Sequence, residues 1–203
     1  MLYEANGLPR LLLDQEAIRA VSGMLQAGFQ VEADPGLSVR DFLIQVLGLD
    51  PAYVEERLRT IFVNGKPVDD IDAARVSPGD VMCLSAALPG AAGICMRRNS
   101  PYAALRGDIT HGRASSDGAV RETGRGLLTV KLFNQTLLDL GPDLLRRGVI
   151  LPWARLLPRL ADLAVRRPDA RIAFDGRDTP LAELAARQEA APGELIRCAA
   201  LEQ

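Results

Sequence analysis

The sequence has few cysteines and a single histidine, which limits the redox and metal chemistry it can carry. Cys83, Cys95 and Cys198 are odd in number and far apart in the chain. This argues against a disulfide framework and indicates a reducing compartment. His111 has no His or Cys at metal-ligand spacing, and three scattered cysteines cannot hold an iron–sulfur cluster. The sequence therefore predicts neither a metal site nor a cofactor.

Long apolar runs are also missing. No stretch approaches the roughly 18 consecutive apolar residues that a membrane helix needs. The first residues, MLYEANGLPRLLLDQ, lack the basic region and the apolar core of a signal peptide. We expect a soluble cytoplasmic protein that does not bind membranes.

A strong basic charge is absent, because the formal net charge is −2. Lys66 and Lys131 are the only lysines, and the arginines form pairs at 97–98, 146–147 and 166–167. These pairs can contact phosphate or lie on solvated faces. The second reading is favoured, since no aromatic residues are interleaved with them. No nucleic-acid partner is expected.

The most structured pattern runs from Thr60 to Gly90. A β-branched and aromatic run precedes Asn64-Gly65, a pair that tolerates the positive φ angles of a type I′ turn. The turn sequence at 77–80 leads into a second apolar strand at 81–84. Upstream, 38–47 predicts an amphipathic helix capped by Ser38 and ended by Gly48, and Asp50-Pro51 opens another short helix.

This order of elements resembles the ubiquitin-like sulfur carriers of thiamine and molybdopterin synthesis, which have the β-grasp fold. The residues that carry the resemblance are Val63-Asn64-Gly65-Lys66, Pro78-Gly79-Asp80-Val81 and Pro89-Gly90. It covers about residues 8 to 90. The resemblance implies an α+β fold of the β-grasp type and a protein partner, an adenylating enzyme or a synthase subunit.

The same pattern recurs in the second half of the chain. Leu12 to Gln15 align with Leu132 to Gln135 without a gap through Val31 and Leu151. Further matches in the same order are Ile61–Gly65 with Ile172–Gly176, and Ser77–Val81 with Ala191–Leu195. The sequence thus predicts two related β-grasp units in tandem.

We expect a β-grasp domain at 1–90, an apolar segment and polar linker at 91–126, and a diverged β-grasp domain at 127–203. In the first unit, residues 17–23 are interpreted as a hairpin, with a helix over 15–26 as the alternative. The hairpin is preferred because Gly141-Pro142-Asp143, at the equivalent place, breaks a helix. In the second, strands at 128–132 and 149–151 are expected to pair, and a helix is expected to start near Leu157, so that Pro158 lies in its first turn.

Candidate binding residues lie just after the first unit: Gly90, Gly93, Cys95, Arg97 and Arg98. In the sulfur carriers the reactive group is the C-terminal carboxylate of a Gly-Gly tail. Here residues 88–93 lack Gly-Gly, and about 110 residues follow. A turn leading out of the last strand is the favoured reading. Cleavage after Gly90 or Gly93 would be needed to create a carboxylate.

Cys95 has cationic neighbours, which favour the thiolate form. A small buried hydrophobe is the competing reading, as it is for Cys83 and Cys198 in their strands. The acids Asp69, Asp70 and Asp72 suit a hard cation or, more simply, a solvated turn.

The chain has no phosphate loop, nucleophile elbow or paired helix carboxylates, so it is not expected to be an enzyme. We expect a non-catalytic interaction or scaffold module. Its working surfaces would be the exposed sheet face or edge of the first unit and the segment 90–105. The apolar strip 94–96 should pack on a sheet, on the second unit or on a partner. The alternative is a sulfur or cofactor transfer component that uses a processed Gly90 or Gly93 terminus or the Cys95 thiol.

Intact mass separates these alternatives. We expect the natively expressed 203-residue chain to give a single species of about 21.9 kDa, because the unprocessed reading is favoured. A shorter species ending at Gly90 or Gly93 would instead support the carrier alternative.

Overall fold

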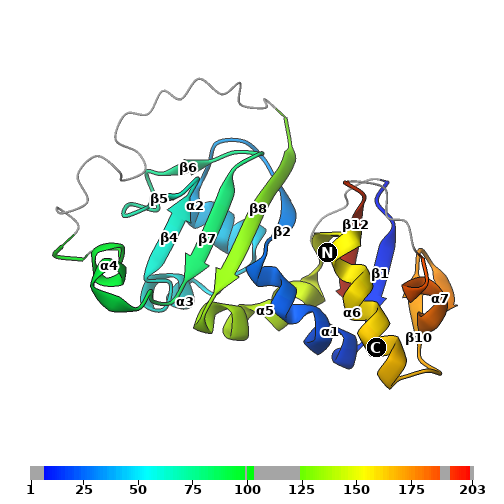
Figure 1. Ribbon diagram of the computed structural model, residues 1–203. Helices are drawn as coiled ribbons and strands as arrows, with labels where there is room; N and C mark the ends of the chain where they lie inside the picture. Colours follow the sequence, from blue (N-terminus) through cyan, green and yellow to red (C-terminus); the bar gives the residue numbers. More distant parts are fainter. Residues whose placement is uncertain (1–6, 99, 103–123, 188–192, 202–203) are drawn as a thin grey trace. The chain divides into compact units, whose positions relative to one another are not determined.

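The computed structural model describes residues 7–98, 100–102, 124–187 and 193–201. It is a mixed α/β fold with parallel and antiparallel strands and several helices (Figure 1). Its internal contacts divide the chain into two compact units. Unit 1 comprises residues 1–30 and 140–203, and unit 2 comprises residues 31–139.

The sheet of unit 2 has a parallel pair of strands at its centre. Its strand order is β2 (Phe29–Ala33), β8 (Gly126–Phe133), β7 (Val81–Ser85), β4 (Thr60–Val63) and β5 (Lys66–Pro67). β7 and β8 are parallel, whereas β4 is antiparallel to both β7 and β5. A separate pair joins β3 (Leu37–Ser38) to β6 (Arg75–Val76).

The helices of unit 2 begin where the sequence supplies caps. α2 (Val39–Asp41) continues as the π-helical turn η2 (Phe42–Val46), and the Ser38 hydroxyl accepts from the Asp41 N–H at 2.9 Å. α3 (Pro51–Glu56) is capped by Asp50, which accepts from the Ala52 N–H at 2.7 Å. Both predicted helices are confirmed. α4 (Gly90–Cys95) follows the last strand of the predicted first unit.

The core of unit 2 lies on one face of its sheet. Alternate residues of β4, β7 and β8 point to that face, as the two-residue period of a strand requires. Each of them is 0% exposed, as are the apolar residues of the helical segment 39–43. The sheet residues are Ile61, Val63, Met82, Leu84, Leu128, Val130 and Leu132, and the helical ones are Val39, Phe42 and Leu43.

Unit 1 also has a mixed sheet with one parallel pair. Its strand order is β11 (Arg177–Pro180), β10 (Arg171–Phe174), β1 (Arg10–Leu13), β12 (Leu195–Ala200), β9 (Val149–Pro152) and β2. β1 and β12 are parallel, whereas β1–β10, β10–β11, β12–β9 and β9–β2 are antiparallel. Its helical elements are α1 (Gln15–Ser22), η1 (Gly23–Gln26), α5 (Gln135–Arg147), α6 (Trp153–Arg166) and α7 (Leu181–Ala185).

Unit 1 combines elements from both ends of the chain, whereas unit 2 is one continuous stretch of the sequence. Unit 2 includes β8, and unit 1 includes β1 and α1. β2 and α5 both continue across the bounds between the units, at 30/31 and 139/140. The division predicted from the sequence, 1–90, 91–126 and 127–203, stays a prediction with bounds different from those of the compact units.

The hairpin expected at residues 17–23 is wrong, and the alternative helix over 15–26 is confirmed as α1 and η1. Asp14 caps this helix by accepting from the Ala17 N–H at 2.8 Å. Ile18, Val21 and Leu25 are at most 2% exposed on its inner face. Burial of this apolar stripe is worth several kcal/mol and outweighs the turn preference of Ser22-Gly23.

The two proline-based expectations for the second half are also wrong. Pro142 lies inside α5, and α6 begins at Trp153 with Pro158 in its interior rather than in a first turn near Leu157. Each proline removes one backbone hydrogen bond, to the carbonyl of Leu138 or Ala154. Both of these residues are exposed, so water can satisfy their carbonyls.

Strand pairing differs in one place. β9 pairs with β12 and β2, not with β8 as expected, and β8 pairs with β7.

The turn predictions are confirmed. The φ angles are 51° at Asn64 and 76° at Gly65, and 48° at Asp175 and 75° at Gly176. Within the described residues, no helix is long and apolar enough to cross a bilayer.

Candidate functional site

The second face of the unit 2 sheet carries a row of three side chains across three strands. Phe62 of β4 lies opposite Cys83 of β7, which lies opposite Lys131 of β8. All three are half-buried, whereas their neighbours on the core face are fully buried. In Figure 1 these strands lie toward the viewer and α2 lies behind them. We call this surface the open face.

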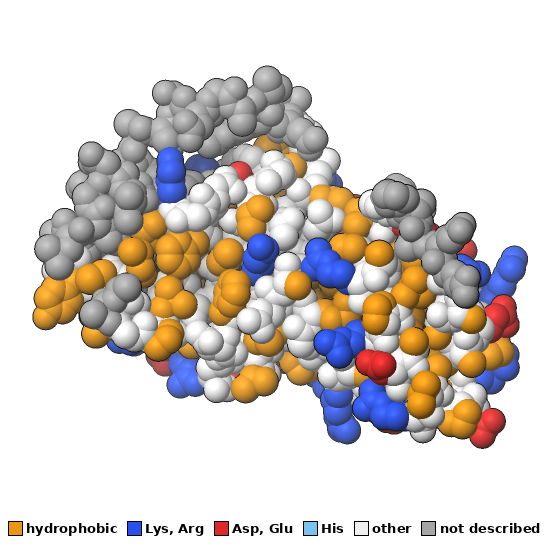
Figure 2. All heavy atoms as spheres, viewed as in Figure 1, with side chains coloured by type: hydrophobic (Ala, Val, Ile, Leu, Met, Phe, Trp, Pro, Cys, Tyr) orange, Lys and Arg blue, Asp and Glu red, His pale blue; other side chains and the backbone are white. Residues whose placement is uncertain are grey.

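Apolar residues extend the open face along the strands. Val81 and Leu127 lie toward one end and Phe133 toward the other, all half-buried. Figure 2 shows hydrophobic side chains gathered over β4, β7 and β8, with basic side chains among them. A contiguous apolar patch of this kind on one side of a sheet is typical of an interaction surface.

The charge on the open face is positive at Lys131. No ion-pair partner of Lys131 is present among the described residues. The neighbouring Cys83 has a raised thiol pKa, because burial disfavours the thiolate, and the Lys131 charge acts in the opposite direction. The net direction makes Cys83 a neutral, weakly polar group rather than a nucleophile. The sequence predicted Cys83 to be a core residue, but it is half-buried on the open face.

The chain after β7 closes one end of the open face. Thr60 and Ser85, which lie opposite each other there, are 0% and 3% exposed. The Ser85 hydroxyl donates to the Ala87 carbonyl at 3.2 Å, and the Asn134 amide donates to the same carbonyl at 3.2 Å. The accessible part of the face is therefore the Phe62–Cys83–Lys131 row and the residues on its other side.

The predicted glycines lie in α4 rather than in an extended tail. Gly90 begins the helix with a φ of 78°. Gly93 packs so closely on the preceding chain that a Cβ there would lie 2.2 Å from the Leu88 carbonyl oxygen. A side chain at 93 would have to displace backbone, which explains the glycine. Cys95 ends the helix and is half-buried, and Ile94 is 41% exposed.

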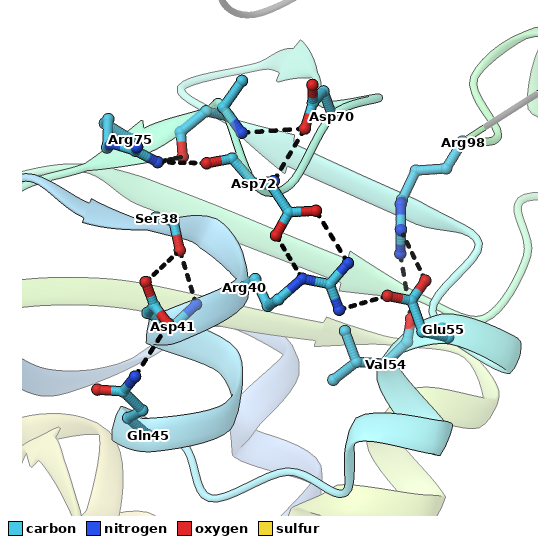
Figure 3. A network of polar contacts seen from close by, with 12 residues as sticks. Ser38, Arg40, Asp41, Gln45, Val54, Glu55, Asp70, Asp72, Arg75 and Arg98 are labelled. Carbon is cyan, nitrogen blue, oxygen red and sulfur yellow. Dashed lines mark hydrogen bonds and ion pairs between the residues drawn. The ribbon is translucent and has the colours of Figure 1, made fainter.

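Arg98 joins this segment to α3. Its guanidinium donates to the Val54 carbonyl at 3.1 Å and to the Glu55 carboxylate at 3.3 Å (Figure 3). It also donates to the Leu58 carbonyl at 3.2 Å. Its backbone N–H donates to the Arg59 carbonyl at 2.7 Å. Arg98 is only 8% exposed, so the solvated face expected for this arginine is wrong. It satisfies carbonyls at the end of a helix, where cations are favoured.

The network continues from Glu55 to Arg40 and Asp72. Arg40 forms an ion pair with Glu55 and donates to both Asp72 oxygens, at 2.5 and 3.0 Å. Hydrogen bonds from Arg40 lower the pKa of both carboxyls, and these bonds raise the pKa of the guanidinium. Asp70 accepts from the N–H groups of Asp72 and Ala73 in a local turn.

Asp70 and Asp72 therefore have structural roles. The positive partner of Asp72 is an arginine of the same unit, as Figure 3 shows. No group of three metal-ligating side chains occurs within the part of the chain that the structure describes.

The edge of the unit 2 sheet is short. β5 has only two residues, and Pro67 cannot donate a backbone hydrogen bond to an added strand. Of the two surfaces expected from the sequence, a face and an edge, the geometry favours the face.

Two cavities in the described part of unit 1, of about 190 and 450 Å³, share Asp14, Arg167 and Leu201 in their walls. Arg167 lies 2.7 Å from Asp14 and 3.4 Å from Glu16. Hydrogen bonds to Arg167 and to the Ala17 N–H outweigh the effect of burial and lower the pKa of Asp14. The opposite charges thus neutralise each other within the wall.

Sequence reasoning missed Lys131 and assigned Cys83 to the core. The alternation of polar and apolar residues in 126–133 was visible, but the partner of that strand was not. Only the β7–β8 register brings Lys131 next to Cys83.

No protein-family model matches this chain, and comparison with curated proteins and with solved structures gives no match either.

Arg98 can be tested by stability. We expect Arg98→Ala to lower the free energy of unfolding by about 1–3 kcal/mol, because two carbonyls lose a buried partner. Arg98→Lys should recover only part of the lost stability, since an ammonium cannot reproduce the planar set of N–H donors of the guanidinium. Arg59→Ala is the matched control, because its side chain is exposed, and it should change the value by less than about 0.5 kcal/mol. Urea unfolding gives the values, and equal effects of Arg98→Ala and Arg59→Ala would contradict the role.

Thiol reactivity separates the three cysteines. We expect iodoacetamide near pH 8 to label Cys95 first, Cys83 more slowly and Cys198 last. Burial raises the pKa of Cys83 and raises that of Cys198 to about 12, so the thiolate fraction at pH 8 is reduced at both. Peptide mass spectrometry measures the order. Cys95 reacting no faster than Cys83 would contradict it, and unfolding in urea should remove the differences.

Proposed function

We propose that this protein is a non-catalytic interaction or scaffold module that docks a protein partner on the open face of unit 2. The observation that carries the proposal is the half-buried row Phe62–Cys83–Lys131. Burial of the apolar surface around this row would lower the free energy by roughly 25 cal/mol per Å², which favours a partner that covers it. A β-grasp assignment belongs to the same proposal, supported by a mixed sheet with helices on one face.

The chemistry of the surface defines the partner. Phe62 and its apolar neighbours fit an apolar patch, and Lys131 fits a carboxylate at the centre of that patch. A buried aromatic anchor beside one desolvated ion pair is the arrangement that concentrates binding energy at protein interfaces. The sulfur-carrier resemblance suggests an adenylating enzyme or a synthase subunit as the partner.

The alternative, sulfur or cofactor transfer through residues 90–95, has less support. A carrier tail has to lie extended in its partner, but these residues form a helix in which Gly93 packs on Leu88. The chain beyond them is held by Arg98, which bonds to α3. A cut after Gly90 or Gly93 would leave that anchor on the other fragment.

Docking is tested by charge reversal. We expect Lys131→Glu to reduce the amount of a specific captured protein at least tenfold, because the reversed charge repels the partner's carboxylate. The bait is the full chain in lysate of its own cells, and captured proteins are quantified by mass spectrometry. Val165→Asp is the control, since Val165 is 83% exposed on α6 and outside the open face.

The result required is a protein retained by the wild type and the control and lost with Lys131→Glu. Circular dichroism should show that both variants are folded. Capture that is equal for all three baits, or no capture, contradicts the proposal.

A further inference from the structure

The two sequence segments on either side of residues 99–123 are interleaved in the fold. All elements from β1 to α4 precede residue 99, and all elements from β8 to β12 follow residue 123. Unit 2 nevertheless takes its interior strand β8, which lies between β2 and β7, from the later segment. Unit 1 takes β1 and α1 from the earlier one. Apart from the short β3–β6 pair, which lies in the earlier segment, neither segment contains all the strands of a sheet.

The pairings between the segments are extensive and buried. β8 pairs with β7 from Val81↔Thr129 to Ser85↔Phe133, and β1 pairs with β12 from Arg10↔Arg197 to Leu13↔Ala200. Without β8, the backbone groups on one edge of β7 would lose their partners. Val130 and Leu132, which are 0% exposed, would also leave the core.

We propose that residues 7–98 and 124–203 are two mutually dependent folding partners. The later segment of a second copy of this chain can then take the place of the chain's own later segment, with its β8 paired to β7. Residues 99–123 connect the partners covalently and can extend to about 80 Å. Such a connection raises the effective concentration of one segment for the other to about the millimolar range. A second copy at comparable concentration during folding therefore competes.

The pairing is tested by cutting the full chain. A recognition sequence for a site-specific protease replaces residues 111–117, and the folded protein is cleaved. We expect both fragments to elute together at the position of the uncut protein. The melting temperature of the cut protein should rise with each tenfold increase in concentration, because its unfolding has become a dissociation. Fragments that separate without unfolding, or a melting temperature independent of concentration, would overturn the proposal.

Thr129 provides a matched pair of variants. Its N–H donates to the Asp80 carbonyl at 3.0 Å, between β8 and β7. Thr129→Pro removes this donor, whereas Thr129→Ala keeps it and changes only the side chain. In cut protein, Thr129→Pro should weaken fragment association at least tenfold relative to Thr129→Ala. The concentration dependence of the cut wild type decides the proposal even where Thr129→Pro does not fold.

Exchange between copies is tested by refolding the protein that carries the protease site. We expect monomer after refolding at micromolar concentration and a growing fraction of dimer near millimolar concentration, measured by size exclusion with light scattering. Cutting such a dimer within 111–117 should convert it to particles of monomer mass, because only the connections hold the two copies together. A dimer that survives cutting is a surface association and overturns the exchange, as does the absence of dimer at every concentration.

Discussion

The fold depends on parallel strand pairing between distant parts of the chain. β7 pairs with β8, about 40 residues further along the chain, and β1 near the start of the sequence pairs with β12 near its end. Parallel strands cannot be joined by a tight turn, so such pairs form between distant segments. β4 adds to β7, β9 to β12 and β10 to β1 by antiparallel contacts, and helices cover one face of the unit 2 sheet. Both the core of unit 2 and its open face are set by the β7–β8 register.

The open face and the Arg98 network are two results of one local arrangement. The chain leaving β7 turns through Ala87 and Gly93, and Arg98 fixes its end against α3. This segment closes the face near Ser85 and leaves the row at Cys83 accessible. The residues that the sequence singled out as a reactive tail thus limit the extent of a neighbouring surface.

Local structure followed from the sequence where one side chain decides it. Ser38 and Asp50 cap helices, and Asn64-Gly65 forms the predicted hairpin turn. Prediction failed where burial competes with local preference, as at Ser22-Gly23 and at Pro142, both of which lie in helical segments with buried inner faces.

Strand pairing could not be predicted from the sequence for another reason. The choice between β7 and β9 as the neighbour of β8 depends on contacts between residues far apart in the chain. The hydrophobic periodicity of one strand shows which face is buried, but it does not show which distant strand lies beside it. The candidate surface was therefore predicted as a sheet face, but its central residues Cys83 and Lys131 were not.

The scarcity of lysine has a practical consequence once the fold is known. Apart from the α-amino group, the ε-amines of Lys66 and Lys131 are the only primary amines of the chain, and both lie on strands of unit 2. Among the side chains, acylating reagents and amine-directed fluorophores therefore mark those of unit 2 alone. With Lys66 replaced by arginine, a label at Lys131 would act as a built-in reporter at the centre of the open face.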